Sequence, residues 1–361
     1  MRIVIHSGKS WQQWSPHVDE VDENQGLGGS QLAATKIAHS IAIMNKKASV
    51  VLIGDFTKDA LRKSVCLPNL VFKPLDQYEI ELFKENVDLL VVSRYTEYLR
   101  SFNSIKNIVL WCHDLAPIGK LFPFTNTFFY TVLALSPWHE HYLKMNFPQN
   151  YVFQTRNGLE PSLYHDEPWQ KKVQHRFIYS SAIYRGLDTV LNCWPLILQR
   201  FPDASLHIYA DFESPLVLSS MQEIGKRLKK KCQDAKRVCC FGFVGQRQLR
   251  DAFYEADVWF YPTEFEETYC ITALEAQASG ALCCYSPVGA LCDTIGKEKG
   301  IEFPQKSTFK DEKDYEKSIV NMVCRALECS EETNVIRKMA RSWALQQSWD
   351  AVAKQWMEEL V

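Results

Sequence analysis

The stretch VWFYPTEFEETYCITALEAQAS, residues 258–279, decides the fold. Its first four residues, 258–261, are apolar and have high β-propensity, so they predict a buried strand. A polar loop with a proline follows, and small and apolar residues then recur at helical spacing over 272–279. A strand that leads through a loop into a helix is the unit from which parallel sheets are built. The stretch therefore predicts an α/β protein with a parallel sheet.

Strand-like runs and amphipathic helices alternate on both sides of this stretch. The expected strands are residues 2–6, 48–53, 87–92, 108–112, 131–135, 177–181, 205–209 and 237–243, and the expected helices include 30–45, 187–200 and 248–255. Ser30 is expected to cap the helix of residues 30–45. Residues 157–176 are polar and turn-rich without a period, as is typical of a domain boundary. We therefore predict two tandem Rossmann-like domains, residues 1–165 and 166–340.

Length and composition agree with two ordinary globular domains. The chain has 361 residues, of which 46% are hydrophobic, 12% aromatic and 23% charged. These values exclude a disordered, collagen-like or disulfide-stapled protein. The formal net charge is only -2, which gives no broad positive surface for a polyanion, so nucleic acid is not an expected partner.

Cysteine usage and the apolar runs bear on the cellular compartment. The twelve cysteines include no CxxC pair, so we expect buried, reduced thiols. The first residues do not read as a signal peptide, and we expect a cytoplasmic protein. Residues 121–138 are apolar but contain prolines, which favours a packed loop and strand over a membrane span. Residues 226–231 hold five basic side chains, which indicate either a solvated helix face or peripheral contact with a membrane or acidic partner.

Two carboxylates, Glu267 and Glu275, flank the predicted junction of loop and helix. A helical connection over these eight steps would separate their Cα atoms by about 12 Å, beyond the roughly 5 to 9.5 Å between the carboxyl groups of a glycosidase. The pair therefore does not suit acid–base hydrolysis. A helix that begins near Cys270 and Ile271 offers N–H groups to a phosphate, while the carboxylates can bind sugar hydroxyls. The alternative is that Glu267 favours the helix dipole and Glu275 is solvated.

Gly28 and Gly29 precede the predicted helix of residues 30–45 and permit close approach of the backbone to a ligand. The alternative is an ordinary tight turn between strand and helix. The sixth position counted from Gly26 is Gln31, whereas the dinucleotide-binding motif has Gly or Ala there. A dehydrogenase is therefore disfavoured.

His113 and Arg185 also stand where a parallel sheet presents ligand-binding groups. His113 follows a predicted strand and has Asp114 beside it; the alternative is a core histidine. Arg185 precedes Gly186 at a helix start, where its guanidinium can reach a diphosphate or remain solvated. No group of His, Cys and carboxylate residues has the spacing of metal ligands, so we predict no bound metal.

Several short motifs follow one another along the chain in a fixed order. They are Gly26-Leu27-Gly28-Gly29-Ser30-Gln31, Trp111-Cys112-His113-Asp114, Leu135-Ser136-Pro137-Trp138-His139, Arg156-Asn157-Gly158, Tyr184-Arg185-Gly186-Leu187-Asp188 and the segment from Glu267 to Glu275. Taken together they resemble the motifs of the retaining GT-B glycosyltransferases of family four, the glycosyl transferases group 1. The resemblance extends over nearly the whole chain.

The resemblance implies a GT-B fold of two Rossmann-like domains with an interdomain cleft. Residues 1–165 would hold the acceptor, and residues 166–340 would hold the nucleotide-sugar donor. Residues 341–361 resemble the C-terminal helix that returns to the N-terminal domain. The implied function is transfer of a sugar from a UDP- or GDP-linked donor to a hydroxyl of a glycan, lipid or small acceptor, with retained configuration.

The resemblance also implies roles for individual residues. Glu267 would bind the transferred sugar, His113 would lie near that sugar, and Arg185 would stabilise the leaving diphosphate. The other expected donor-binding residues are Gly28, Gly29, Cys270, Ile271 and, at the ribose hydroxyls, Glu275. Trp11, Trp14 and His17 can stack on acceptor sugars or pack within their own loop. No metal or other cofactor is needed, because protein cations and backbone donors carry the leaving charge.

Three positions depart from the family's pattern. The earlier of two basic residues that usually face the diphosphate is absent near Ser181 or Ala182, and Thr268 and Cys270 stand where glycines are usual. The loop is therefore less free in its backbone than a glycine-rich loop. These departures motivate one alternative, a catalytically weak or silent nucleotide-sugar-binding protein. A nucleotide-sugar epimerase or hydrolase of the same fold is a second alternative.

Overall fold

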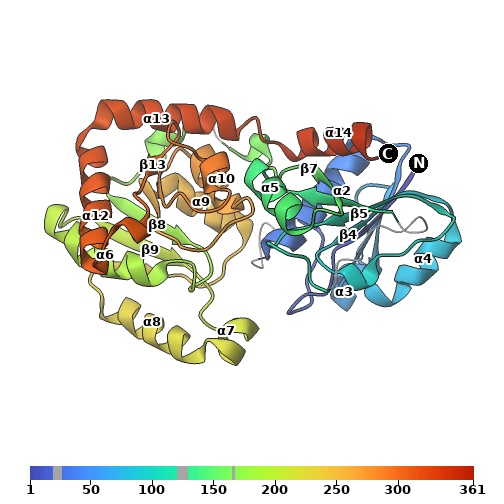
Figure 1. Ribbon diagram of the computed structural model, residues 1–361, viewed down its shortest axis with the longest axis horizontal. Helices are drawn as coiled ribbons and strands as arrows, with labels where there is room; N and C mark the ends of the chain where they lie inside the picture. Colours follow the sequence, from blue (N-terminus) through green and yellow to red (C-terminus); the bar gives the residue numbers. More distant parts are fainter. Residues whose placement is uncertain (19–26, 120–128, 165–166) are drawn as a thin grey trace. The chain divides into compact units, whose positions relative to one another are not determined.

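The computed structural model describes residues 1–361 except 19–26, 120–128 and 165–166 (Figure 1). The chain divides into two compact units. The first comprises Met1–Leu159 together with Gln347–Val361, and the second comprises Glu160–Gln346. The first unit is therefore built from two segments of the chain, whereas the second is one uninterrupted segment.

A seven-stranded parallel sheet forms the centre of the first unit, in the order β3-β2-β1-β4-β5-β6-β7. Its strands are β1 (Arg2–His6), β2 (Ser49–Gly54), β3 (Leu70–Pro74), β4 (Val87–Ser93), β5 (Ile105–Trp111), β6 (Thr131–Ala134) and β7 (Tyr151–Gln154). The helices of this unit are α2 (Gly29–Met44), α3 (Lys58–Arg62), α4 (Tyr78–Lys84), α5 (Pro137–Asn146) and α14 (Trp349–Glu359).

A six-stranded parallel sheet forms the centre of the second unit, in the order β10-β9-β8-β11-β12-β13. Its strands are β8 (Arg176–Ser180), β9 (Ser205–Tyr209), β10 (Val238–Cys240), β11 (Val258–Tyr261), β12 (Leu282–Tyr285) and β13 (Ile301–Glu302). Its helices are α6 (Leu187–Arg200), α7 (Pro215–Ser220), α8 (Gln222–Asp234), α9 (Gln246–Glu255), α10 (Ile271–Ala278), α11 (Leu291–Thr294), α12 (Glu312–Glu328) and α13 (Ser330–Ala344).

Both sheets reverse their strand order at one point, between β1 and β4 in the first unit and between β8 and β11 in the second. In open α/β sheets, ligands bind beyond the carboxyl ends of the strands at such a switch point. The predicted α/β class with two Rossmann-like sheets is confirmed, and each unit has a position where a ligand site is expected.

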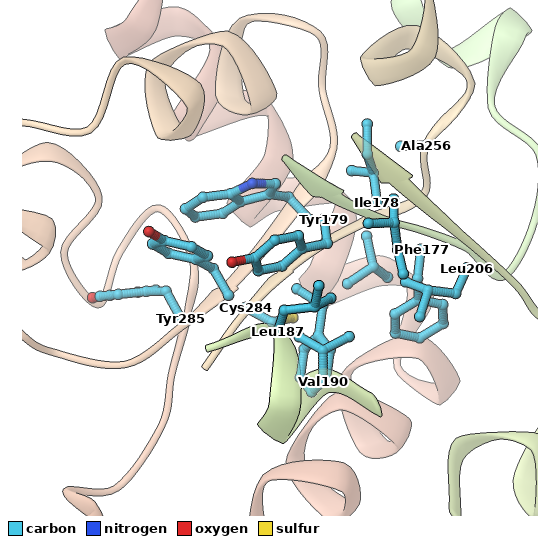
Figure 2. Packing of buried hydrophobic residues seen from close by; sticks show 14 of the residues in the cluster. Phe177, Ile178, Tyr179, Leu187, Val190, Leu206, Ala256, Cys284 and Tyr285 are labelled. Carbon is cyan, nitrogen blue, oxygen red and sulfur yellow. The ribbon is translucent and has the colours of Figure 1, made fainter. Parts of the chain in front are cut away.

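The core of the second unit is formed by apolar faces of its sheet and helices. Figure 2 shows Leu187 and Val190 of α6 close to Phe177 of β8, and all three are fully buried. Phe177 also meets the Trp194 ring edge-on, with 5.6 Å between the ring centroids. This packing fixes α6 against the sheet and so fixes the loop that precedes α6.

The C-terminal segment returns to the first unit, as predicted. Residues 341–344 still belong to α13, and a new helix, α14, begins after Ser348, whose Oγ accepts from Ala351 N at 3.1 Å. Trp356 of α14 is fully buried and donates from Nε1 to Thr155 Oγ1 at 2.8 Å. The two passages between the units meet here, because Leu159 N donates to Gln347 O at 2.8 Å and Trp349 N donates to Leu159 O at 3.1 Å.

Two local expectations are corrected by the structure. The N-cap of α2 is Gly28, without a side-chain cap, and Ser30 lies inside the first turn. All twelve cysteines are free thiols, but five of them are exposed rather than buried: Cys66, Cys239, Cys240, Cys292 and Cys329.

The basic run of residues 226–231 lies on α8, and carboxylates pair with most of its charges. Arg227 and Lys231 both contact Asp188, at 2.8 and 2.6 Å, and Lys229 contacts Glu213 at 2.7 Å. These ion pairs favour the interpretation as a solvated helix face. Among the helices of the described residues, none is both long and apolar enough to cross a membrane.

Candidate functional site

The switch point of the second sheet carries a cluster of polar side chains. The strand β8 ends at Ser180 and β11 ends at Tyr261. Ser181 Oγ and the Tyr261 hydroxyl lie 3.1 Å apart across this point. The loop of residues 262–270 leads from here into α10, so its side chains lie where the strand order of the sheet reverses.

Glu267 is the central residue of this cluster and is only 6% exposed. Its carboxylate accepts from Arg185 Nη1, at 3.0 Å to Oε1 and 3.2 Å to Oε2. The Tyr261 hydroxyl donates to Oε1 at 2.6 Å. The sequence predicted Glu267 and Arg185 at the site with separate ligands, and the structure places them in direct contact with each other. A buried carboxylate needs such partners to remain charged.

Arg185 is held by aromatic rings as well as by Glu267. Its guanidinium carbon lies 3.9 Å from the Phe265 ring centroid and 5.7 Å from that of Tyr184. Burial opposes the charged form, but the Glu267 carboxylate and nearby tyrosines outweigh burial and raise the pKa of Arg185 above its ordinary value. The site therefore carries a permanent positive charge in a fixed position.

The backbone of residues 267–270 is fixed by a neighbouring loop. Ala290 N donates to Glu267 O at 2.8 Å, and a Cβ on Gly289 would lie 2.6 Å from that same oxygen. Cys270 is the N-cap of α10 with a left-handed φ of 70°, a conformation that glycine adopts more readily. Ile271 is the first residue of α10, whose first turn has N–H groups that lack partners within the helix. Cys270 thus adopts a left-handed backbone conformation, although it is not a glycine.

Glu275 lies further along α10 and is partly exposed. Tyr164 is its neighbour: burial, and after it the Glu275 charge, raise the pKa of the Tyr164 hydroxyl well above its ordinary value. Tyr261, Phe265 and Tyr164 were not predicted as site residues. Tyr261 stands in an apolar run, Phe265 in a loop and Tyr164 in a boundary segment, and none of these patterns indicates a ligand.

His113 lies in the first unit, directly beyond the end of β5. Its ring packs on Trp111 with 4.3 Å between the centroids. Burial, together with the nearby Arg94 and His139, holds the pKa of His113 well below its ordinary value. Arg94 itself donates from Nε to Asp114 Oδ2 at 2.7 Å. His113 is therefore a neutral imidazole beside a charged pair at the carboxyl edge of the sheet.

The other predicted residues of the first unit have different surroundings. A Cβ on Gly28 would lie 2.5 Å from Gln31 Oε1, and Gly29 begins α2. Trp11 is 68% exposed, whereas Trp14 is buried against Phe56. His17 Nε2 contacts Ala60 O at 2.9 Å. Of the three predicted acceptor-binding residues, Trp11 therefore offers an exposed ring, and Trp14 packs in the core of the unit. Gly26 lies outside the described residues.

Comparison with known proteins gives a family match to part of the chain. The family model described as "Glycosyl transferases group 1" matches residues 174–325, which lie in the second unit and include Arg185, Glu267 and Glu275. This match covers less than half of the chain, so it describes residues 174–325 and not the whole protein. An uncharacterized glycosyltransferase of Methanocaldococcus jannaschii is 25% identical over 170 residues, which are 42% of this chain and 40% of that relative.

Solved structures show that the chain has the GT-B fold. Sucrose-phosphate synthase from Thermosynechococcus elongatus matches with a TM-score of 0.73 and 16% identity, over 99% of this chain and 98% of that chain. The Anabaena protein HepE in complex with UDP-glucose matches with a TM-score of 0.68 and 17% identity, over 100% and 99% of the two chains. The same protein with UDP and glucose has a TM-score of 0.69 at 16% identity, over 100% and 99%.

Three buried histidines predict that the first unit is sensitive to acid. Burial lowers the pKa of His6 to about 3 and that of His139 to about 4, and His113 is also lowered. Each is neutral when folded and titrates near 6.5 when unfolded, so stability is present above pH 6.5 and is lost as pH falls towards the folded pKa. At pH 5 each costs about 2 kcal/mol.

Urea unfolding at pH 7.5 and pH 5.0 measures this effect. Replacing His6 by phenylalanine should reduce the loss between the two pH values by about 2 kcal/mol, because one titrating group is removed. His141 is exposed on α5, and His141→Gln serves as the control with an unchanged loss. An equal loss in wild type and His6→Phe would contradict the prediction.

Proposed function

We propose that the protein transfers a sugar from a nucleotide-sugar, UDP- or GDP-linked, to a hydroxyl of a glycan, lipid or small acceptor, with retained anomeric configuration. The observation that carries the proposal is the Arg185–Glu267 pair at the switch point of the second sheet, directly before the N-terminus of α10. A fixed cation and the first turn of a helix both favour a diphosphate. The Anabaena protein HepE, which has been solved with UDP-glucose, lends support to a UDP-sugar.

In this proposal the leaving diphosphate is stabilised by charge and needs no covalent intermediate. Arg185 and the N–H groups near Cys270 and Ile271 bind the phosphates. Glu267 orients the transferred sugar, and Glu275 binds the ribose hydroxyls. The leaving phosphate accepts the proton of the acceptor hydroxyl on the same face of the sugar.

The first unit is assigned to the acceptor, with the exposed Trp11 ring as a stacking surface and His113 near the transferred sugar. His113 is neutral, so its ring can both donate a hydrogen bond to a hydroxyl and accept one from it. We assign the reaction to the cytoplasm, where the free cysteines remain reduced.

Thermal unfolding with a panel of UDP-, GDP-, ADP- and dTDP-sugars tests the donor assignment. A ligand at 100 times its dissociation constant adds about 2.7 kcal/mol of stability. The panel is followed by turnover assays with and without hydroxyl acceptors. Binding without turnover would favour a silent binding protein, and release or isomerisation of the sugar without acceptor would favour a hydrolase or epimerase.

We further propose that transfer needs no metal ion, since Arg185 and the start of α10 can carry the leaving charge. Excess chelator should then leave turnover unchanged. Within the described residues, no three His, Cys, Asp or Glu side chains are placed to hold a metal ion. Loss of transfer in chelator with recovery in Mg²⁺ or Mn²⁺ would contradict this division of roles.

A further inference from the structure

The hydroxyl of Tyr261 extends from the end of a strand of the sheet to the polar side chains around Glu267. Tyr261 is the last residue of β11 and is fully buried. Its ring stacks on Trp259, with 4.7 Å between centroids and 27° between planes. The hydroxyl is directed at Glu267 Oε1, at 2.6 Å, and at Ser181 Oγ, at 3.1 Å. A phenylalanine would keep the ring packing and lose only these two polar contacts.

The Tyr261 hydroxyl is a permanent hydrogen-bond donor. Burial, and after it the Glu267 charge, raise the pKa of Tyr261 well above its ordinary value. The phenol therefore keeps its proton at neutral pH. A short hydrogen bond from a neutral donor to a buried carboxylate is among the stronger polar contacts in a protein.

Arg185 and Tyr261 hold Glu267 in different ways. Arg185 bonds to both carboxylate oxygens through a guanidinium whose charge also suits a diphosphate. Tyr261 bonds to Oε1 alone, from a ring that the sheet fixes in place. When a diphosphate attracts Arg185, Tyr261 remains as the fixed partner of Glu267. Without the Tyr261 hydroxyl, the buried Glu267 carboxylate would have no fixed partner to orient it while the sugar is transferred.

We infer that Tyr261 is a positioning residue, which keeps the Glu267 carboxylate aligned with the transferred sugar while Arg185 binds the diphosphate. The inference rests on the proposed function. Ser181 supports the Tyr261 hydroxyl in this role, and the basic residue that is usual in the family is absent near Ser181 or Ala182. In this chain, two neutral hydroxyls therefore flank the switch point.

The test compares Tyr261→Phe with Tyr285→Phe in the full chain. Tyr285 is the register partner of Tyr261 on β12, is equally buried, and donates its hydroxyl to a different carboxylate, Glu302 Oε2, at 3.0 Å. Tyr261→Phe should lower kcat by about 10- to 100-fold, the effect of a hydrogen bond to a charged group, with less than threefold change in donor KM. Tyr285→Phe should change kcat by less than about twofold.

A double-mutant cycle tests whether Tyr261 acts through Glu267. If it does, Tyr261→Phe combined with Glu267→Gln should be no slower than Glu267→Gln alone. Additive losses would overturn the inference, and so would equal kcat values in Tyr261→Phe and Tyr285→Phe. Failure of Tyr261→Phe to fold would also overturn it, since the hydroxyl would then be structural. A wild-type chain that neither binds nor turns over any nucleotide-sugar would instead overturn the proposed function.

Discussion

Replacing Arg185 by alanine should reduce turnover by about 100- to 1000-fold, as does the loss of one positioned donor at a developing negative charge. The guanidinium is fixed before any ligand arrives, by Glu267 at 3.0 Å and by the Phe265 ring at 3.9 Å. Such preorganisation acts mainly in the transition state, where charge leaves with the diphosphate. The affinity for the donor should therefore fall less than kcat.

The measurement is kcat and donor affinity, together with the free energy of unfolding. Arg185→Lys keeps the charge but loses the planar guanidinium that lies on the Phe265 ring, and its turnover should lie between wild type and alanine. Arg200 at the far end of α6 pairs with Glu328 at 2.6 Å, and Arg200→Ala is the matched control for loss of an ion pair. If the Arg185→Ala variant were as active as the Arg200→Ala variant, the assignment of this loop to donor binding would be contradicted.

The second large effect is expected for Glu267→Gln. Glutamine keeps the shape of the side chain but removes the charge that pairs with Arg185, and it replaces one carboxylate oxygen by an NH2 group that cannot accept a hydrogen bond. We expect turnover to fall by about 100-fold, with a smaller change in donor KM, because the sugar would be misaligned in the transition state.

Glu275→Gln is the contrasting variant. If Glu275 holds ribose hydroxyls equally in the ground and transition states, its replacement should mainly raise donor KM and leave kcat nearly unchanged. The same assays with both variants therefore separate the two roles. Identical kinetic changes at residues 267 and 275, or none at either, would contradict the assignment.

The central strands were predictable because burial on both faces leaves a strong apolar signal. The runs 2–6, 205–209 and 258–261 were predicted with the bounds that β1, β9 and β11 have, and so was the helix 187–200. Strands β12 and β13 were missed. The sequence of β12, LCCY, contains no β-branched residue, and β13 has only two residues, so neither gives a periodic signal. Strands β3 and β7 were missed as well.

The candidate site was predictable as a set of residues but not as a set of contacts. The spacing of Glu267 and Glu275 and the motif at Arg185 identified the loop. That Arg185 binds Glu267 depends on how α6 and the loop pack on the sheet, which no local pattern records. Tyr261 was hidden for a related reason: within an apolar strand, its hydroxyl has no distinguishing neighbour in the sequence.

The chain passes between the two units at residues 159–160 and 346–347, and these two connections lie side by side. This has a consequence for protein engineering. Leu159 and Gln347 are joined by a backbone hydrogen bond of 2.8 Å. The two ends of the segment 160–346, which follow Leu159 and precede Gln347, are therefore close together. We therefore expect that residues 160–346 can be replaced, as a single gene fragment, by the matching segment of a protein with the same fold. Such a chimaera would keep α14 together with α2, which it contacts, and would replace the whole loop of residues 262–270.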